Sequence, residues 1–191
     1  MKSNSLLTFV LLAFILISCQ NSDNAVISYE NNLDAATLST KPIIIPTEEG
    51  FSLLQSIDGN AGGTIKFDTS YFDINGDSIA FNINIRFLPK SFSGVKEIQI
   101  VPHQNLGSIE FFPDMNFNNF VLLNLSYKGL NLSQLGFDSN SKIDFVYQAE
   151  NGTIENILSK QCNILWNQKQ IFVTGAQLSH FSRYAFVRKC Q

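Results

Sequence analysis

Apolar and polar side chains alternate through most of the chain after residue 62. In residues 79–87 an Ile or Phe occupies every odd position, and the even positions are mostly polar. A period of two sends successive side chains to opposite faces of a strand, so this segment is predicted to be a strand with one buried face. Similar segments predict strands near residues 64–68, 95–101, 108–112, 120–127, 143–148, 153–158, 163–166, 170–174 and 184–188.

Turn-forming residues separate these segments, and helical patterns are scarce. The pair Asn75-Gly76 predicts a hairpin turn, because both residues tolerate a positive φ. Residues 130–135 have the spacing of a single turn and no more. Many short strands with turns between them are typical of an all-β protein, and we predict a single β-sandwich.

A different pattern occupies the beginning of the chain. Lys2 precedes an apolar run over residues 6–17, which is too short to span a bilayer as a helix and ends at Ser18-Cys19. The sequence Leu-Ile-Ser-Cys at 16–19 resembles the lipobox of bacterial lipoproteins. That resemblance implies cleavage before Cys19 and attachment of acyl chains to it, each buried methylene adding about 0.8 kcal/mol to membrane binding. The alternative is an ordinary secretory signal that happens to end in cysteine.

The predicted organisation has three parts. Residues 1–18 form the signal peptide, residues 19–47 carry the lipidated cysteine and a polar tether, and residues 48–191 form the sandwich domain. Within the tether, Pro42 and Pro46 bracket three isoleucines that are predicted to form a short edge strand. Removal of 18 residues from 191 leaves 173, which is the length of one domain with a substantial core.

The net charge of the chain limits the classes of binding partner that are expected. The chain has a formal net charge of −3, which becomes about −4 when Lys2 leaves with the signal peptide. A mildly acidic protein lacks the basic surface that nucleic acids select, so nucleic acid is excluded as a partner. By resemblance to sorting signals, the absence of Asp after Cys19 indicates the outer membrane. The sequence does not assign the periplasmic face or the cell surface.

Two cysteines remain after lipidation. Cys162 and Cys190 are an even pair in a chain predicted to be exported, so they are candidates for a disulfide. Two separate thiols are the equal alternative, because spacing along the chain does not give the distance between them.

Several segments of the domain resemble the ZU5-like β-sandwiches of bacterial surface proteins. The resemblance covers about residues 60–188 and rests on an opening Gly-Gly-Thr-Ile at 62–65, Phe-Pro at 112–113, Gly-Leu at 129–130 and a closing His-Phe-Ser-Arg-Tyr at 180–184. It departs from that family at residues 87–92. In a few related domains a His-Phe-Ser sequence is a self-cleavage site, which implies Ser182 as nucleophile and His180 as base. The structural alternative, which we favour, places Phe181 in the core of a final strand.

Other chemistry has weaker support. The calcium-like spacing of Asp73, Asn75 and Asp77 lacks the acidic twelfth position, so a hairpin turn is favoured and no metal or cofactor is predicted. No sequence motif of a hydrolase or nucleotide-binding protein occurs. Trp166 is the candidate aromatic platform for a glycan, with Tyr127 as a second aromatic, although core or rim packing is favoured for Trp166.

These patterns predict a lipid-anchored protein of the cell envelope that is a structural or interaction module and not an enzyme. Its predicted partners are the membrane, through Cys19, and an envelope protein or a glycan. The two alternatives are a glycan-binding accessory lipoprotein and a domain that cleaves itself between Phe181 and Ser182. A sandwich fold alone does not choose among them.

Overall fold

The computed structural model describes residues 42–47, 50–73, 75–103, 107–149, 151–158 and 160–189. The described part of the chain is built from β-strands and contains no α-helix. The ten strands are β1 Ile43–Thr47, β2 Gly50–Asp58, β3 Gly63–Phe72, β4 Ser78–Phe87, β5 Val95–His103, β6 Ser108–Lys128, β7 Ile143–Gln148, β8 Ile154–Asn156, β9 Gln161–Leu165 and β10 Gln170–Arg188. A short 3-10 turn, η2 at Trp166–Gln168, links β9 to β10.

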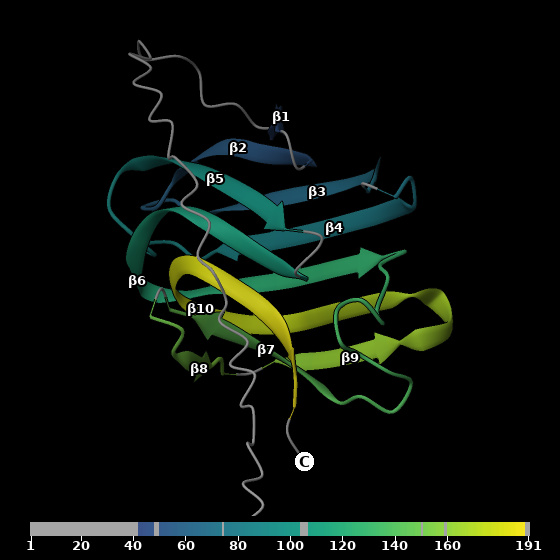
Figure 1. Ribbon diagram of the computed structural model, residues 1–191. Helices are drawn as coiled ribbons and strands as arrows, with labels where there is room; N and C mark the ends of the chain where they lie inside the picture. Colours follow the sequence, from purple (N-terminus) through teal and green to yellow (C-terminus); the bar gives the residue numbers. More distant parts are fainter. Residues whose placement is uncertain are drawn as a thin grey trace, which may run out of the picture. The chain divides into compact units, whose positions relative to one another are not determined.

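The strands form one connected antiparallel sheet that folds over itself into two layers (Figure 1). The first layer has the order β1-β2-β5-β6-β10-β7-β8. The second layer has the order β3-β4-β6-β10-β9. This arrangement confirms the prediction of an all-β sandwich.

Strands β6 and β10 belong to both layers. The first part of β6 pairs with β5 and its last part pairs with β4, while β10 pairs first with β9 and later with β7. Along their shared ladder, three register shifts interrupt β10, between Val173 and Ala176, between Leu178 and His180, and between Phe181 and Arg183. Bulges bend a strand and increase its twist, so these interruptions carry β10 from one layer to the other.

An aromatic core joins the layers. The ring of Phe51 on β2 lies 5.6 Å from that of Phe81 on β4, measured between centroids. Further along the sandwich, Phe181 stacks on Phe111 with centroids 4.8 Å apart and an angle of 11° between the rings. Both Phe181 and Phe111 are fully buried. The many phenylalanines of the sequence therefore serve largely to fill the space between two sheets.

The predicted hairpin turn is present between β3 and β4. Asp73 Oδ1 accepts hydrogen bonds from the backbone N–H groups of Asn75 (2.9 Å) and Asp77 (2.8 Å). Gly76 has a φ of 82°, whereas Asn75 does not use the left-handed region. The carboxylate of Asp73 thus closes its own turn, as expected for the hairpin alternative to a calcium loop.

Four features of the observed fold differ from the prediction. Strand β2 begins at residue 50, before the region where alternation becomes clear, and was not predicted. Strand β1, by contrast, coincides with the edge strand predicted at the three isoleucines, and it pairs with β2 at one end of the first layer. Predicted strands 108–112 and 120–127 are parts of one strand, β6, and predicted strands 170–174 and 184–188 are parts of β10. Trp166 lies in η2 and not at the end of a strand.

Candidate binding face on the second layer

The outer face of the second layer is lined by amide and hydroxyl side chains. On β4, Phe81 and Ile83 are buried, while Asn82 between them is partly exposed. The same alternation on β6 turns Asn124 and Ser126 outward. Antiparallel pairing brings these positions together, since Asn82 faces Ser126 across the ladder.

Strand β10 continues this face with an aromatic residue. Ser126 pairs with Phe172, and Phe172 in turn pairs with Asn163 on β9. Phe172 is partly buried, in contrast to its fully buried neighbours Ile171 and Val173. A row of outward side chains therefore crosses four neighbouring strands, with one aromatic ring among polar groups.

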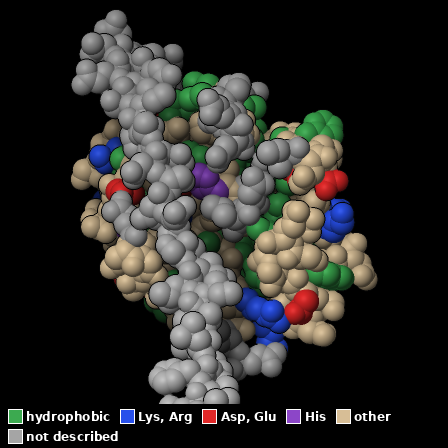
Figure 2. All heavy atoms as spheres, in the orientation of Figure 1, with side chains coloured by type: hydrophobic (Ala, Val, Ile, Leu, Met, Phe, Trp, Pro, Cys, Tyr) green, Lys and Arg blue, Asp and Glu red, His purple; other side chains and the backbone are tan. Residues whose placement is uncertain are grey.

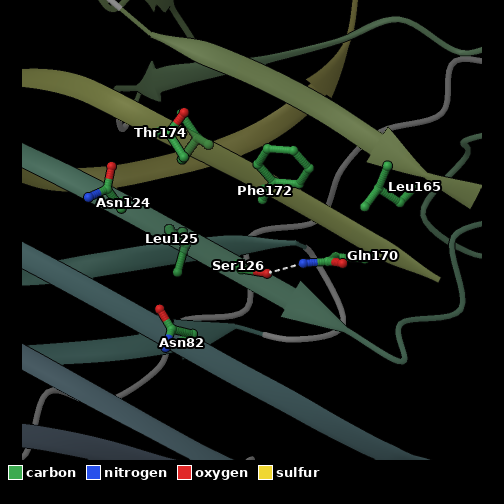
Figure 3. A pocket seen from close by; sticks show the side chains of 9 residues that line it. Asn82, Asn124, Leu125, Ser126, Leu165, Gln170, Phe172 and Thr174 are labelled. Carbon is green, nitrogen blue, oxygen red and sulfur yellow. Dashed lines mark hydrogen bonds between the residues drawn. The ribbon is translucent and has the colours of Figure 1, made fainter. Parts of the chain in front are cut away.

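A shallow groove lies over these strands, with a volume of about 330 Å³. Figure 3 shows its side chains along β6 and β10, with Phe172 between Leu165 on one side and Asn124 and Thr174 on the other. No charged residue lines this groove. Its lining consists of Asn82, Asn124, Leu125, Ser126, Leu165, Gln170, Phe172, Val173 and Thr174.

Two hydrogen bonds hold the polar side chains of the groove in place. Gln170 Nε2 donates to Ser126 Oγ at 2.8 Å, across the pair of strands β10 and β6. Asn124 Oδ1 accepts from the backbone N–H of Gly175 at 2.9 Å. That bond ties Asn124 to the first register shift of β10, beside Thr174, so the bulge shapes one end of the groove.

The same bonds leave other groups available to a ligand. Asn124 uses its amide oxygen within the protein, and its amide N–H₂ has no protein partner among the hydrogen bonds of the described residues. The side chains of Asn82 and Thr174 likewise make no hydrogen bond there. The groove therefore presents both donors and acceptors around Phe172.

The His-Phe-Ser segment lies on β10 in a different part of the sandwich. Phe181 is 1% exposed and forms part of the core, as the structural alternative predicts. Ser179 Oγ lies 3.0 Å from His180 Nδ1, and the ring of Tyr147 packs edge-on against His180 with centroids 4.5 Å apart. Among the described residues no hydrogen bond joins His180 to Ser182, and a register shift falls at Ser182.

The predicted aromatic platforms lie elsewhere than the groove. Trp166 is partly buried, packs against the core and does not line the groove. Tyr127 is fully buried and donates a hydrogen bond from its hydroxyl to the Ser108 carbonyl at 2.8 Å. Tyr127 therefore cannot be an exposed platform, because its position on the inner side of β6 encloses it. Phe172 is the aromatic residue that the structure places among polar groups.

Cys162 is half-buried on β9, in a setting that suppresses reactivity. Burial, together with the nearby carboxylate of Asp144, raises the pKa of its thiol to about 11. Asp144 is itself paired with Lys160 at 2.9 Å. Cys190 and the lipidation candidate Cys19 lie outside the described residues, so the disulfide and the anchor stay predictions.

A charged cluster spans β5, β6 and β10 in the first layer. Glu110 lies 3.2 Å from His103 Nε2 through one oxygen, and accepts from Arg183 at 3.0 Å through the other. Burial alone would raise the pKa of Glu110, but the hydrogen bond from His103 and the charge of Arg183 outweigh it and lower that pKa. One carboxylate thus joins three strands, through an ion pair with Arg183 and a contact with His103.

Acidic, histidine and cysteine side chains form no group of three or more able to hold a metal ion in the part of the chain that the structure describes. Over the same residues, no helix is long and apolar enough to cross a bilayer. Charged side chains on the face seen in Figure 2 are scattered among polar and apolar ones and do not gather into one patch.

The fold defines the chain as an all-β sandwich protein, with an amide-rich groove on the outside of one layer. Comparison with known proteins adds nothing to this description: no family model, no curated protein and no solved structure matches the chain.

Proposed function

We propose that this protein is a lipid-anchored binding module of the bacterial envelope, which holds its ligand in the groove on the outer face of the second layer. The observation that carries the proposal is the groove itself. It combines an aromatic ring with amide and hydroxyl groups, of which the side chains of Asn82 and Thr174 make no hydrogen bond among the described residues. Concave surfaces with apolar walls and a few well-placed polar groups are typical of ligand sites.

The anchor is supported by the sequence at 16–19 and by the position of the first strand. The lipobox-like cysteine at 19 precedes the first described residue, Pro42, by 23 positions. A chain of that length, rich in Asn and Ser, is a tether that would let the sandwich stand clear of a membrane. An outer-membrane location follows from the same resemblance and forms part of the proposal.

The proposed role is binding without catalysis. His180 and Ser182 are the candidate cleavage residues, yet His180 is engaged with Ser179 and Tyr147. The carbonyl of His180 accepts a hydrogen bond from the Tyr184 hydroxyl at 2.5 Å, which fixes the backbone beside Phe181. These contacts favour a structural role for the His-Phe-Ser segment, since self-cleavage needs a strained and accessible peptide bond.

The experiment is an intact mass of the protein extracted from membranes of the cell that makes it, with and without reductant. One species heavier than residues 19–191 by its acyl groups supports the anchored module. A species that splits after Phe181 on reduction would overturn the non-enzymatic role, because that split requires cleavage before Ser182.

The Cys19→Ala variant sharpens this test. It should move from the membrane fraction to the soluble fraction, because the predicted acylation site is gone. Ser18→Ala, which keeps both a small residue at position 18 and the cysteine, is the matched control. Membrane retention of Cys19→Ala would contradict the lipid anchor.

A further inference from the structure

We infer that the groove binds a neutral glycan chain, with Phe172 as the stacking platform and Asn82, Asn124 and Thr174 as the hydrogen-bonding groups. This inference rests on the proposed binding function and names its ligand by chemical class. A pyranose ring combines an apolar C–H face with a rim of hydroxyl groups. The groove offers an apolar centre and a polar surround of matching kind.

Amide side chains suit the rim of a sugar. A carboxamide carries two N–H donors and a carbonyl acceptor in one plane, so it can bond two neighbouring hydroxyl groups that each act as donor and acceptor. The amide of Asn82 makes no hydrogen bond among the described residues, and Asn124 keeps its N–H₂ group for a ligand because its oxygen is bound to the backbone N–H of Gly175. The bond between Gln170 and Ser126 holds two further polar groups in fixed positions.

Phe172 supplies the apolar face. Its flanks on β10 are Gln170 and Thr174, which also line the groove, so the ring is bordered by polar groups on its own strand. Across the ladder it lies between Ser126 and Asn163. An aromatic ring held within a sheet has little conformational freedom to lose when a ligand packs on it.

The absence of charge from the lining favours a neutral ligand over an acidic one. None of the nine lining residues is charged, so an acidic sugar would lose hydration in the groove without gaining an ion pair. Beside the groove, Asp68 pairs with the lining residue Asn82 and Lys128 pairs with the lining residue Gln170, so the flanking charges are of both signs and do not favour an anion.

A peptide strand fits this surface less well than a sugar. Extended peptides gain affinity by adding to the open edge of a sheet. Strands β4, β6 and β10 are paired on both sides, so their backbone groups are already used in the ladders beneath the groove. A ligand here must be recognised by side chains, and the lining consists of amides, hydroxyls, three aliphatic residues and one aromatic ring.

The test uses the full mature protein, extracted with its anchor in a detergent that has no sugar headgroup. The probes are immobilised neutral oligosaccharides of hexoses and of N-acetylhexosamines, in α and β linkages, beside uronic acid and sulfated oligosaccharides. We expect at least one neutral series to bind. Phe172→Ala should weaken that binding by roughly tenfold or more, and Phe172→Tyr should retain it.

Phe72→Ala is the matched control, because Phe72 is 75% exposed at the end of β3 and does not line the groove. It should bind as the unchanged protein does. Asn82→Asp, a change of nearly equal size, should weaken binding by several-fold because it replaces two donors with a charge.

Binding to no neutral series, stronger binding to the acidic series, or equal losses in Phe72→Ala and Phe172→Ala would each overturn the inference. A loss of glycan binding alone leaves the anchored module standing, since Cys19 reports on the anchor independently. Membrane retention of Cys19→Ala with intact glycan binding would instead overturn the anchor and leave the ligand class in place.

Discussion

Two phenylalanines on strand β10 lie in opposite environments. Phe181 is fully buried between the layers, stacked on Phe111, while Phe172 lies at the surface among amides nine positions earlier on β10. Residue type does not distinguish them. Their difference comes from their positions along the strand that carries both.

The two rings differ because 172 is an even and 181 an odd position, and the two register shifts between them cancel. Before the first shift, the buried positions are odd, at Ile171 and Val173; after it they are even, at Ala176 and Leu178; the second shift restores odd burial at Phe181. An uninterrupted strand would therefore also turn Phe172 outward and Phe181 inward. The third shift has a lasting effect, since Tyr184 and Phe186 at even positions are buried beyond it, together with Ala185.

The largest effect on stability is expected for Phe181→Ala, which tests whether this ring belongs to the core. Removing a fully buried ring that also touches Phe87 and Phe117 should lower the free energy of unfolding by about 3–5 kcal/mol. Denaturant unfolding would measure this, with Phe181→Leu as a control that keeps part of the volume. A loss below about 1 kcal/mol would place the ring outside the core.

Replacing a buried polar residue on the inner side of β2 should increase stability, in contrast to the loss expected for Phe181→Ala. Gln55 on β2 is buried, and its Oε1 has no hydrogen-bond partner among the described residues. Gln55→Leu should raise the free energy of unfolding by about 1–2 kcal/mol, because an unpaired polar atom leaves the interior. Gln170→Leu removes a paired glutamine from the outer face and should give no gain. A fall in stability for Gln55→Leu would contradict the assignment.

The ion pair between Glu110 and Arg183 in the first layer should contribute less to stability than the buried side chains do. Because the folded-state pKa of Glu110 is lowered, its contribution to stability is present above its ordinary pKa and is lost as the pH falls through the folded value. Glu110→Gln should therefore cost about 1 kcal/mol near pH 7, and that difference should shrink in acid. Unfolding curves over a series of pH values would measure this. A difference that does not change with pH would show that charge plays no part.

The smallest change in stability is expected at the surface ring. Phe172→Ala should alter the free energy of unfolding by no more than about 1 kcal/mol, since the ring is already partly in water. Together with Phe181→Ala it forms a matched pair, with the same substitution on the same strand. Comparable losses in thermal or denaturant unfolding would mean that both rings belong to the core.

The sequence predicted the sandwich because its regular strands follow simple rules. Strand β4 alternates without interruption and pairs in even register on both sides, so its buried face could be assigned from residues 79–87 alone. The hairpin at residues 73–77 was likewise predictable, because Asp73 and Gly76 determine it locally.

The groove was not predicted, because residues 170–174 and 184–188 were predicted to be two separate strands and not parts of the single strand β10. A local period of two over Gln170, Phe172 and Thr174 does place a phenylalanine on a polar face, and that signal was available in the sequence. The sequence does not show which residues surround Phe172 in the folded protein. Asn82 and Asn124 reach the groove through strand pairings over more than 40 positions, and no local pattern contains such pairings. Trp166, the candidate that residue type alone favours, is partly buried against the core and does not line the groove.

The position of β10 also bears on how the sandwich can fold. Among the described strands it comes last along the chain, and it lies inside both layers between earlier strands. Neither layer can close until β10 has paired with β6, because the earlier strands alone leave an open edge in each layer. Closure of the two layers is therefore one late and shared event, which makes the stability of each layer depend on the same pair of strands.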